Sequence, residues 1–398
     1  MANVSSSNGL EKRPKLRFPG FDEPWKLRKL NDMLNQRIEK QIPSVDAPLM
    51  AFTAEGGVEP KGERYDRSYL VKNEDKLYKR TEYNDFIYSS NNLDVGSIGL
   101  NRYGTAVISD VYEIFSVKSD YLPTFVSELI QRPQNMKKVL KYRQGCLYGQ
   151  YRIYAEDFLS VPVFVPTKQE QEKISQFLDS LDKRIAYQRS LINNLKKYKR
   201  GAVQKLFSEM DMKQWELVQL KDVVNIFDGT HQTPNYKTTG VRFISVENIL
   251  NPLATQKYIS EDDYQKEFKV HPEYGDVLMT RIGDIGRTCY VNFVSDMAYY
   301  VSLALFKCSS KIDGRYLAAY ISTNDFQKEL WERTLHIAFP KKINTGEIGE
   351  CYIHLPSRER QIVIASYLDV IEKKIQLAEK QFNLMQLIKT GLMQQLFI

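Results

Sequence analysis

The chain has 398 residues and a mass of 46.4 kDa, more than one ordinary hydrophobic core holds, so we expect two domains. With 42% hydrophobic and 26% charged residues, no long apolar run, no secretory signal pattern and no paired cysteines or histidines, the composition is typical of a reduced, metal-free cytoplasmic protein. The chain has a net charge of +7, and its excess of positive charge lies in residues 1–20, 161–210 and 351–398, so the two regions between them are not generic polyanion binders.

Residues 1–20 are expected to form a flexible N-terminal tail, and residues 21–160 a first mixed α/β domain. In that domain, residues 106–108 and 112–117 have the composition of strands, and a helix is expected to start at residue 125.

Residues 161–210 contain a long amphipathic helix, expected from about residue 168 to 207. Its apolar residues recur at alternating intervals of three and four, which places them on one stripe. Thr167 and Glu170 have the spacing of a capping box at the start. A helix of this length would extend roughly 60 Å at about 1.5 Å per residue. It cannot cover its apolar stripe alone.

Residues 211–350 predict a second mixed domain. Strands are expected at 242–246, 276–280 and 302–306, and residues 316–330 have helical spacing.

Residues 351–398 repeat the long helix at a constant offset of 190 residues, with 13 of 47 aligned positions identical. The openings of the two domains, after Trp25 and Trp215, are repeated as well. In the second copy Ser357 is the cap and Arg360 replaces the reciprocal glutamate, so we expect a weaker cap.

The repeat predicts an α+β fold with a pseudo-twofold internal repeat. It consists of two mixed α/β domains, each followed by a long helix, and the two helices pair as an antiparallel coiled coil. The alternative is that each helix packs only on its own domain. Retained polar residues, Gln171/Gln361, Asp179/Asp369 and Lys183/Lys373, suggest that the helices also bind a further partner. The residues predicted to form the helix pairing are Leu178, Leu181, Ile185, Ile192, Leu195, Leu368, Ile371, Ile375, Phe382 and Met385.

Loops in both domains mix small, basic and aromatic residues whose polar groups can hydrogen-bond base edges or phosphates. The strongest is residues 227–237, where glycine and proline restrict the backbone. For any single residue, a solvated surface role is the alternative. The candidate DNA-binding residues are Lys61, Arg64, Arg67, Arg102, Tyr103, Arg143, Gln144, Arg152, Thr230, His231, Gln232, Thr233, Tyr236, Lys237, Arg281, Arg287, Lys341 and Lys342.

Catalytic motifs are not recognisable. The sequence has no phosphate-binding loop ending in Lys-Ser or Lys-Thr, no Asn-Pro-Pro-aromatic methylation motif, and no nucleophile and base that can be nominated together. Glu74-Asp75-Lys76 lacks the preceding Pro-Asp of a nuclease motif and is interpreted as surface charge. The sequence therefore predicts a protein that is not an enzyme and binds no cofactor or metal itself.

The arrangement resembles the specificity subunit of a type I DNA restriction-modification enzyme. The resemblance rests on the duplicated Pro-x-x-x-Glu-Gln-x-x-Ile-x-x-x-Leu helix start at Pro166 and, with Arg360 in place of Glu, at Pro356, and on the Gly229-Thr-His-Gln-Thr-Pro loop. It covers nearly the whole chain after residue 20.

The resemblance implies a reader of double-stranded DNA whose two target-recognition domains each recognise one part of an asymmetric split site. It also implies two methyltransferase subunits that use S-adenosylmethionine to methylate adenine and, through them, two restriction subunits that use ATP and Mg. The alternatives are a stand-alone, double-headed DNA-binding regulator and a coiled-coil interaction protein that does not bind DNA.

Overall fold

A computed structural model of the chain describes residues 12–54, 56–60, 76–91, 93–145, 151–208 and 213–398. The chain divides into two compact units. The first consists of Met1–Gln188 with Phe382–Ile398, and the second of Arg189–Gln381. Each unit contains one mixed domain and parts of both long helices. No helix among the described residues combines the length and apolar character of a membrane span.

The first domain and its long helix contain β1 (Lys26–Lys29), α1 (Leu30–Met33), β2 (Leu34–Gln36), β3 (Lys40–Gln41), β4 (Ala51–Thr53), β5 (Gly57–Glu59), β6 (Tyr78–Thr81), β7 (Phe86–Ser89), β8 (Ile98–Leu100), β9 (Ala106–Ile108), β10 (Tyr112–Val117), α2 (Pro123–Ile130), α3 (Pro133–Val139), η3 (Leu140–Tyr142), β11 (Gln144–Gly145), β12 (Tyr151–Arg152), α4 (Ala155–Ser160), β13 (Pro162–Val165) and α5 (Lys168–Leu206).

The second domain and its long helix contain β14 (Glu216–Gln219), η5 (Leu220–Asp222), β15 (Val224–Asp228), β16 (Val241–Ile244), η6 (Pro252–Ala254), β17 (Tyr258–Ile259), α7 (Glu261–Glu267), β18 (Val277–Thr280), β19 (Thr288–Tyr290), β20 (Met297–Tyr299), β21 (Leu303–Cys308), α8 (Gly314–Ile321), α9 (Asn324–Glu332), α10 (Thr345–Gly349), β22 (Tyr352–Leu355) and α11 (Arg358–Leu396).

Both domains are built on a four-stranded antiparallel sheet with the same strand order. The order is β2-β10-β7-β8 in the first domain and β15-β21-β18-β19 in the second. A helix follows the long inner strand in each, α2 after β10 and α8 after β21. The repeat therefore continues through the domains, although their sequences have diverged.

Two equivalent aspartates mark this shared sheet. Asp85 and Asp276 stand just before β7 and β18, and each accepts a 2.7 Å hydrogen bond from the backbone N–H three residues earlier, at Glu82 and Glu273. Each also pairs with a cation, yet burial raises the pKa of both carboxyl groups. The same buried turn thus starts the central strand in both domains.

The first strand of each domain pairs antiparallel with the last. β1 pairs with β13, and β14 pairs with β22. Both last strands lead directly into a long helix. Trp25 and Trp215 precede the first strands and contact Phe397 and Phe207, with ring centroids 6.1 and 6.4 Å apart. Each domain thus begins and ends beside a helix terminus.

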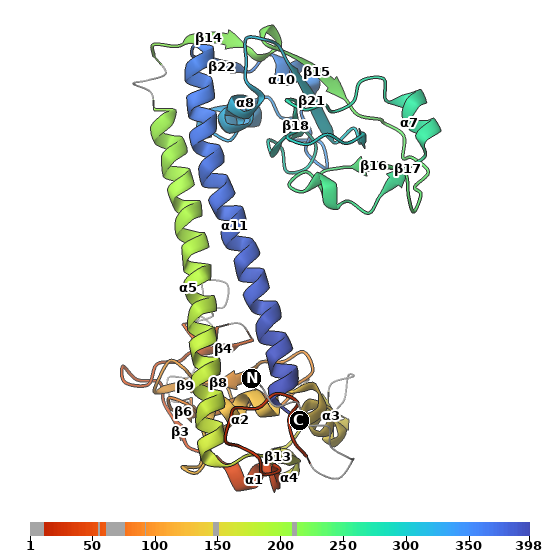
Figure 1. Cartoon of the computed structure of the whole chain (residues 1–398). Coiled ribbons are helices and arrows are strands. Elements are labelled where there is room, and N and C mark those ends of the chain that lie inside the picture. Colours follow the sequence, from red (N-terminus) through yellow and green to blue (C-terminus); the bar gives the residue numbers. More distant parts are fainter. Residues whose placement is uncertain (1–11, 55, 61–75, 92, 146–150, 209–212) are drawn as a thin grey trace. The chain divides into compact units, whose positions relative to one another are not determined.

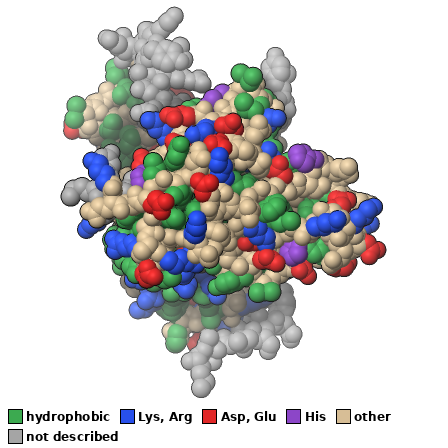
Figure 2. All heavy atoms as spheres, turned by 90° about the horizontal axis from the view of Figure 1, so that it is seen from above, with side chains coloured by type: hydrophobic (Ala, Val, Ile, Leu, Met, Phe, Trp, Pro, Cys, Tyr) green, Lys and Arg blue, Asp and Glu red, His purple; other side chains and the backbone are tan. Residues whose placement is uncertain are grey.

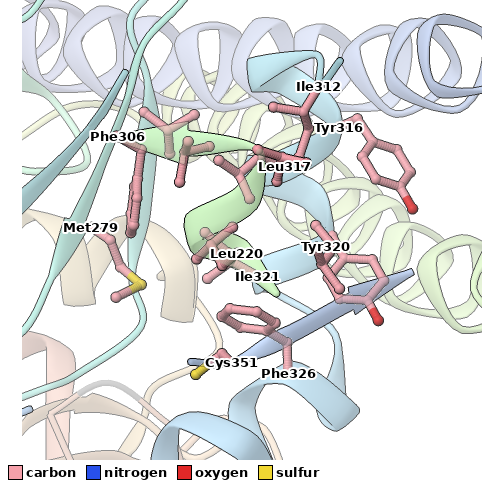
Figure 3. Packing of buried hydrophobic residues seen from close by; sticks show 14 of the residues in the cluster. Leu220, Met279, Phe306, Ile312, Tyr316, Leu317, Tyr320, Ile321, Phe326 and Cys351 are labelled. Atoms are coloured by element: carbon pink, nitrogen blue, oxygen red, sulfur yellow. The ribbon is translucent and has the colours of Figure 1, made fainter. Parts of the chain in front are cut away.

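The main core of the second unit lies between its central sheet, its helices and the long helices. Met279 and Phe306 extend from the sheet toward Leu317 and Phe326 of α8 and α9 (Figure 3). Leu368 and other residues of α11 belong to the same cluster. A second cluster in this unit packs around the smaller sheet β17-β16-β20. The first unit has a corresponding main core that includes both Leu178 of α5 and Leu396 of α11.

The predicted strands and helices were mostly confirmed. Helix α2 begins at Pro123, two residues before the predicted start, because proline is well suited to a first helical turn. Residues 316–330 form parts of two helices, since Thr323 caps a new one and its Oγ1 accepts a 3.4 Å hydrogen bond from Phe326 N–H. Within the predicted tail, described residues pack on the first unit, and Leu16 N–H donates to the Gln395 carbonyl at 2.9 Å.

The two 39-residue helices α5 and α11 pair antiparallel, as predicted (Figure 1). In the second unit, Lys196 pairs with Glu379 and Lys199 with Glu372, so residue numbers fall along α11 as they rise along α5. In the first unit, Lys389 pairs with Asp182 at 2.6 Å. This contact is the repeat of the 2.7 Å Lys199–Glu372 pair, because Lys389 lies 190 positions after Lys199 and Asp182 lies 190 positions before Glu372.

The predicted apolar stripes lie on the inner sides of the helices. Each residue predicted to form the pairing is buried or half-buried, and Ile371 and Ile375 are 4% exposed. Leu195 of α5 packs against the cluster that contains them. The alternative in which each helix packs only on its own domain is therefore wrong.

Candidate nucleic-acid interface

Three loops lie together in the second unit, and they contain all the DNA-binding residues predicted there. They are residues 229–237 after β15, residues 281–287 between β18 and β19, and residues 335–342 between α9 and α10. We call them the first, second and third loops. The backbone and one arginine hold them in a fixed arrangement.

The first loop is fastened to strand β20. Thr230 N–H donates to the Tyr299 carbonyl at 3.2 Å, and Val301 N–H donates to the Thr230 carbonyl at 2.9 Å. A Cβ on Gly229 would lie 2.3 Å from the Tyr299 carbonyl oxygen, so only glycine allows this close approach. Beside the loop, the surface is hollowed by a pocket of about 740 Å³ that is also lined by Lys266 and Lys269.

Side chains of the first loop face solvent. His231, Gln232, Thr233, Tyr236 and Lys237 are exposed, and Thr230 is half-buried. The Tyr236 ring packs edge-on against buried Phe243 at 5.6 Å, which fixes its direction while its hydroxyl end stays accessible. The loop thus presents an imidazole, an amide, hydroxyls and an ammonium group on a restrained backbone.

The second loop is a tight turn organised by Thr280. Its Oγ1 accepts a 2.9 Å hydrogen bond from Arg287 N–H, and its carbonyl accepts one from Gly286 N–H at 2.9 Å. Arg287 is exposed and pairs with Asp284, also exposed, at 2.5 Å. Such a pair is screened by water and adds little stability, so the guanidinium is accessible to a ligand.

Arg281 ties the three loops together and does not face solvent. Its side chain is 7% exposed and pairs with Asp228, next to the first loop, at 3.2 Å. It also donates to the carbonyl of Val301 at 2.8 Å and to that of Ile343, beyond the third loop, at 3.2 Å. Arg281, predicted to contact DNA, is therefore placed to position the loops rather than to touch a ligand.

The third loop is stapled to the second. Ile282 of the second loop and Lys342 of the third form a bridge, and Gly283 N–H donates to the Lys341 carbonyl at 2.8 Å. The Lys341 ammonium lies over the Trp331 ring, 4.3 Å from its centroid. Lys341 and Lys342 are both exposed. Figure 2 shows one face of this unit, with Lys and Arg side chains interspersed among Asp and Glu.

In the first unit the predicted residues fall into two groups, and Lys61, Arg64 and Arg67 lie outside the described residues. The first group contains Arg102 and Tyr103. Arg102 donates to Thr124 Oγ1 at 2.7 Å and also bonds to Asn84 Oδ1, and Tyr103 is exposed.

Strands β11 and β12 bring the second group together, with Gln144 opposite Arg152. Arg143 is exposed, and its guanidinium lies over the Tyr151 ring at 5.2 Å. Arg152 pairs with buried Glu113 at 3.2 Å, a partly structural role that the sequence did not predict.

The duplicated glutamines do not form a partner surface, contrary to our prediction. Gln171 and Gln361 are both 1% exposed. Their side-chain oxygens accept from the N–H of Leu122 at 3.2 Å and of Asp313 at 2.8 Å, residues at the starts of α2 and α8. They lock each long helix to its own domain, and this role explains their repetition.

The helix caps also differ from the prediction. Thr167 and Ser357 each accept a 3.4 Å hydrogen bond from the N–H three residues later, so the two caps are alike. The Glu170 carboxylate does not complete a capping box. It forms two 2.7 Å hydrogen bonds with Arg17 instead.

A groove of about 750 Å³ lies between α5 and α11 within the second unit. Tyr198, Tyr367 and Val363 line it and are exposed, and their hydrophobic surface is not covered by the rest of the unit. Lys205 and Arg360 also line it and contribute positive charge. The groove thus combines apolar, aromatic and basic side chains, a mixture that is common in protein-binding surfaces.

Sequence reasoning missed two features beside the three loops. Ile337 and Phe339 at the tip of the third loop are exposed, although an apolar pair in a sequence is usually taken as core. Trp331, whose ring lies under the Lys341 ammonium, lies just beyond the predicted helical stretch and was not singled out. Only the spatial arrangement brings these residues to the candidate site.

Comparisons with known proteins agree with this geometry. The family model for the type I restriction modification DNA specificity domain matches residues 22–197 and, in a second copy, residues 212–385. The type I restriction enzyme MjaVIII specificity subunit of Methanocaldococcus jannaschii is 24% identical over 321 residues, which cover 72% of this chain and 75% of that protein.

Two solved structures share the fold. A type I restriction-modification S subunit from M. genitalium has a TM-score of 0.62 at 14% identity, covering 97% of this chain and 99% of its own. A chain from a study of complex assembly and conformational transition of a type I R-M system has a TM-score of 0.54 at 16% identity, covering 94% and 96%. With both halves matched by the same family, this chain belongs to the type I restriction-modification specificity subunits.

Proposed function

We propose that the chain reads an asymmetric, two-part DNA site, with one domain for each part, and directs adenine methylation or restriction by partner subunits. The observation that carries the proposal is the clustering of three polar loops in the second unit, on a frame that is duplicated in the first. Exposed His231, Gln232 and Arg287 offer the amide, imidazole and guanidinium groups that hydrogen-bond base edges. Because the two domains differ in sequence, the two parts of the site would differ as well.

The chain itself supplies no reaction chemistry in this proposal. No group of three or more His, Cys, Asp or Glu side chains suited to a metal ion occurs within the described ranges. S-adenosylmethionine would bind to two methyltransferase subunits, and ATP and Mg to two restriction subunits. The contribution of this chain would be to place the methyltransferases over the correct adenines.

We place the methyltransferase contact on the paired helices. The groove beside Tyr198 and Tyr367 is lined by residues of α5 and α11, several of them apolar, and by no residue of the three loops. Near-neutral domains bind DNA weakly on their own, so a docked partner that closes around the duplex would supply much of the affinity. A stand-alone regulator, in contrast, would need no such surface.

Exchange of one domain tests the proposal. Residues 21–160 are replaced with the corresponding domain of another family member, the chimera is expressed with its methyltransferase, and methylated adenines are mapped across the host genome. One part of the methylated sequence should change and the other should stay the same. Loss of both parts, or a methylation pattern that does not depend on this gene, would refute the proposal.

A further inference from the structure

The tip of the third loop exposes apolar side chains completely. Its sequence is Ile337-Ala338-Phe339-Pro340, and Ile337 and Phe339 have 99% and 104% of their reference surface areas exposed. Other phenylalanines of this unit, such as Phe243 and Phe306, are fully buried. A phenylalanine held entirely in water gains nothing for folding, so its position calls for a different explanation.

The base of the third loop is held in place by hydrogen bonds, although its tip is fully exposed to solvent. Leu335 N–H donates to the Lys342 carbonyl at 2.8 Å, and Ile343 N–H donates to the Arg281 carbonyl at 3.0 Å. The His336 and Trp331 rings lie 4.2 Å apart, and His336 Nε2 is 2.9 Å from the Trp331 carbonyl oxygen. The tip is thus presented on a fixed support and need not be ordered when a ligand binds.

Basic residues follow the tip in the chain and lie on the neighbouring second loop, where Arg287 pairs with Asp284. Lys341 and Lys342 follow the tip directly, and the exposed Arg287 belongs to the second loop, to which the third is stapled. Two apolar side chains bordered by cations do not resemble a protein-binding surface, which usually buries about 800 Å² on each partner. They do resemble the combination with which proteins enter a duplex: cations for the phosphates and Phe, Ile or Pro as a wedge.

We propose that Ile337 and Phe339 form a wedge that inserts between neighbouring base pairs when the second unit binds its part of the site. The inference rests on the proposed DNA-reading function and adds to it a deformation of the duplex. Partial unstacking at one base step would make recognition depend on how easily that step opens, in addition to the hydrogen bonds made by the first two loops. The ligand is double-stranded DNA with a flexible step opposite the third loop.

Fluorescence of 2-aminopurine tests the wedge, because this base brightens when it is unstacked. The complete complex of this chain with its methyltransferase is mixed with duplexes that carry the mapped methylation sequence and one 2-aminopurine at successive positions of the second part. We expect a rise of several-fold at one step with the wild-type chain. Phe339→Ala should abolish the rise and weaken binding by roughly ten-fold, and Phe339→Leu should retain most of both.

The matched control is Val294→Ala, which removes an apolar side chain that is 94% exposed but lies outside the three loops. It should change neither the fluorescence nor the affinity. Circular dichroism and co-purification with the methyltransferase show whether each variant is folded and assembled.

The outcomes separate the wedge from the proposed function. If the wild-type complex fails to bind its methylation sequence, the DNA-reading function is wrong. If it binds but no position brightens, or if Phe339→Ala binds and brightens like wild type, the wedge is wrong while the function stands. Loss of methyltransferase assembly in Phe339→Ala would show that the tip is a protein contact, which also overturns the wedge.

Discussion

Replacement of Arg281 should destabilise the second unit far more than replacement of its exposed neighbour Arg287. Arg281→Ala removes a buried guanidinium that bonds to two backbone carbonyls and to Asp228. Breaking a buried ion pair costs about 3–5 kcal/mol. The Asp228 side chain is 32% exposed and can regain water, so we expect a loss near the lower limit, about 3 kcal/mol.

Urea unfolding of the full chain measures this loss, which is read from the transition in which the second unit unfolds. Arg281→Lys keeps the charge but reaches fewer acceptors, so about half of the loss should remain. Arg287→Ala, whose ion pair is exposed, should cost less than about 0.5 kcal/mol. If Arg281→Ala and Arg287→Ala unfold at the same urea concentration, the positioning role assigned to Arg281 is refuted.

Two substitutions test the helix frame, and the reactivity of two cysteines tests the effect of burial on their thiols. Ile371→Lys buries a charge in the helix seam and should cost several kcal/mol in unfolding free energy, whereas Val370→Lys at its exposed neighbour should cost almost nothing; similar melting temperatures would contradict the seam. Gln361→Leu leaves three backbone groups without their side-chain partner, two of them buried, and should cost about 3 kcal/mol by denaturant unfolding; a neutral result would exclude the proposed lock. Burial raises the pKa of Cys289 to about 11 and of Cys351 to about 12, so both thiols should react slowly with a disulfide reagent at pH 8. Their contribution to stability should be lost as the pH rises above about 9 toward those values, and rapid labelling of either Cys289 or Cys351 in the native chain would contradict the raised pKa values.

The frame was predictable because its signal is periodic and duplicated. A stripe at alternating intervals of three and four residues identifies a helix in any context, and a repeat at one offset identifies its partner. The shared order of the central sheets was not predictable, since strand pairing depends on contacts far apart in sequence. In the sequence, the visible sign of this shared order was the Tyr-x-Asp pattern that stands just before β7 and β18.

The candidate site could be predicted by residue type but not by role. Glycine, proline and polar residues indicated the first loop, and its exposed side chains agree with that. Arg281 and Gln361 have the composition of surface residues, and only their burial reveals that they hold other parts in place. Ile337 and Phe339 were missed for the opposite reason, because hydrophobic residues in a sequence give no sign that they will face water.

The pairing of the first and last strands of each domain has a consequence for how new DNA specificities arise. β1 lies beside β13, and β14 lies beside β22. The chain of each domain therefore begins and ends on a pair of adjacent strands, and this pair joins the domain to the long helices. A segment of any length or internal design is compatible with the helices if its two ends meet there. Under the proposed function, recombination at these borders would therefore exchange one DNA-reading domain in a single event, without passing through a series of weakened intermediates.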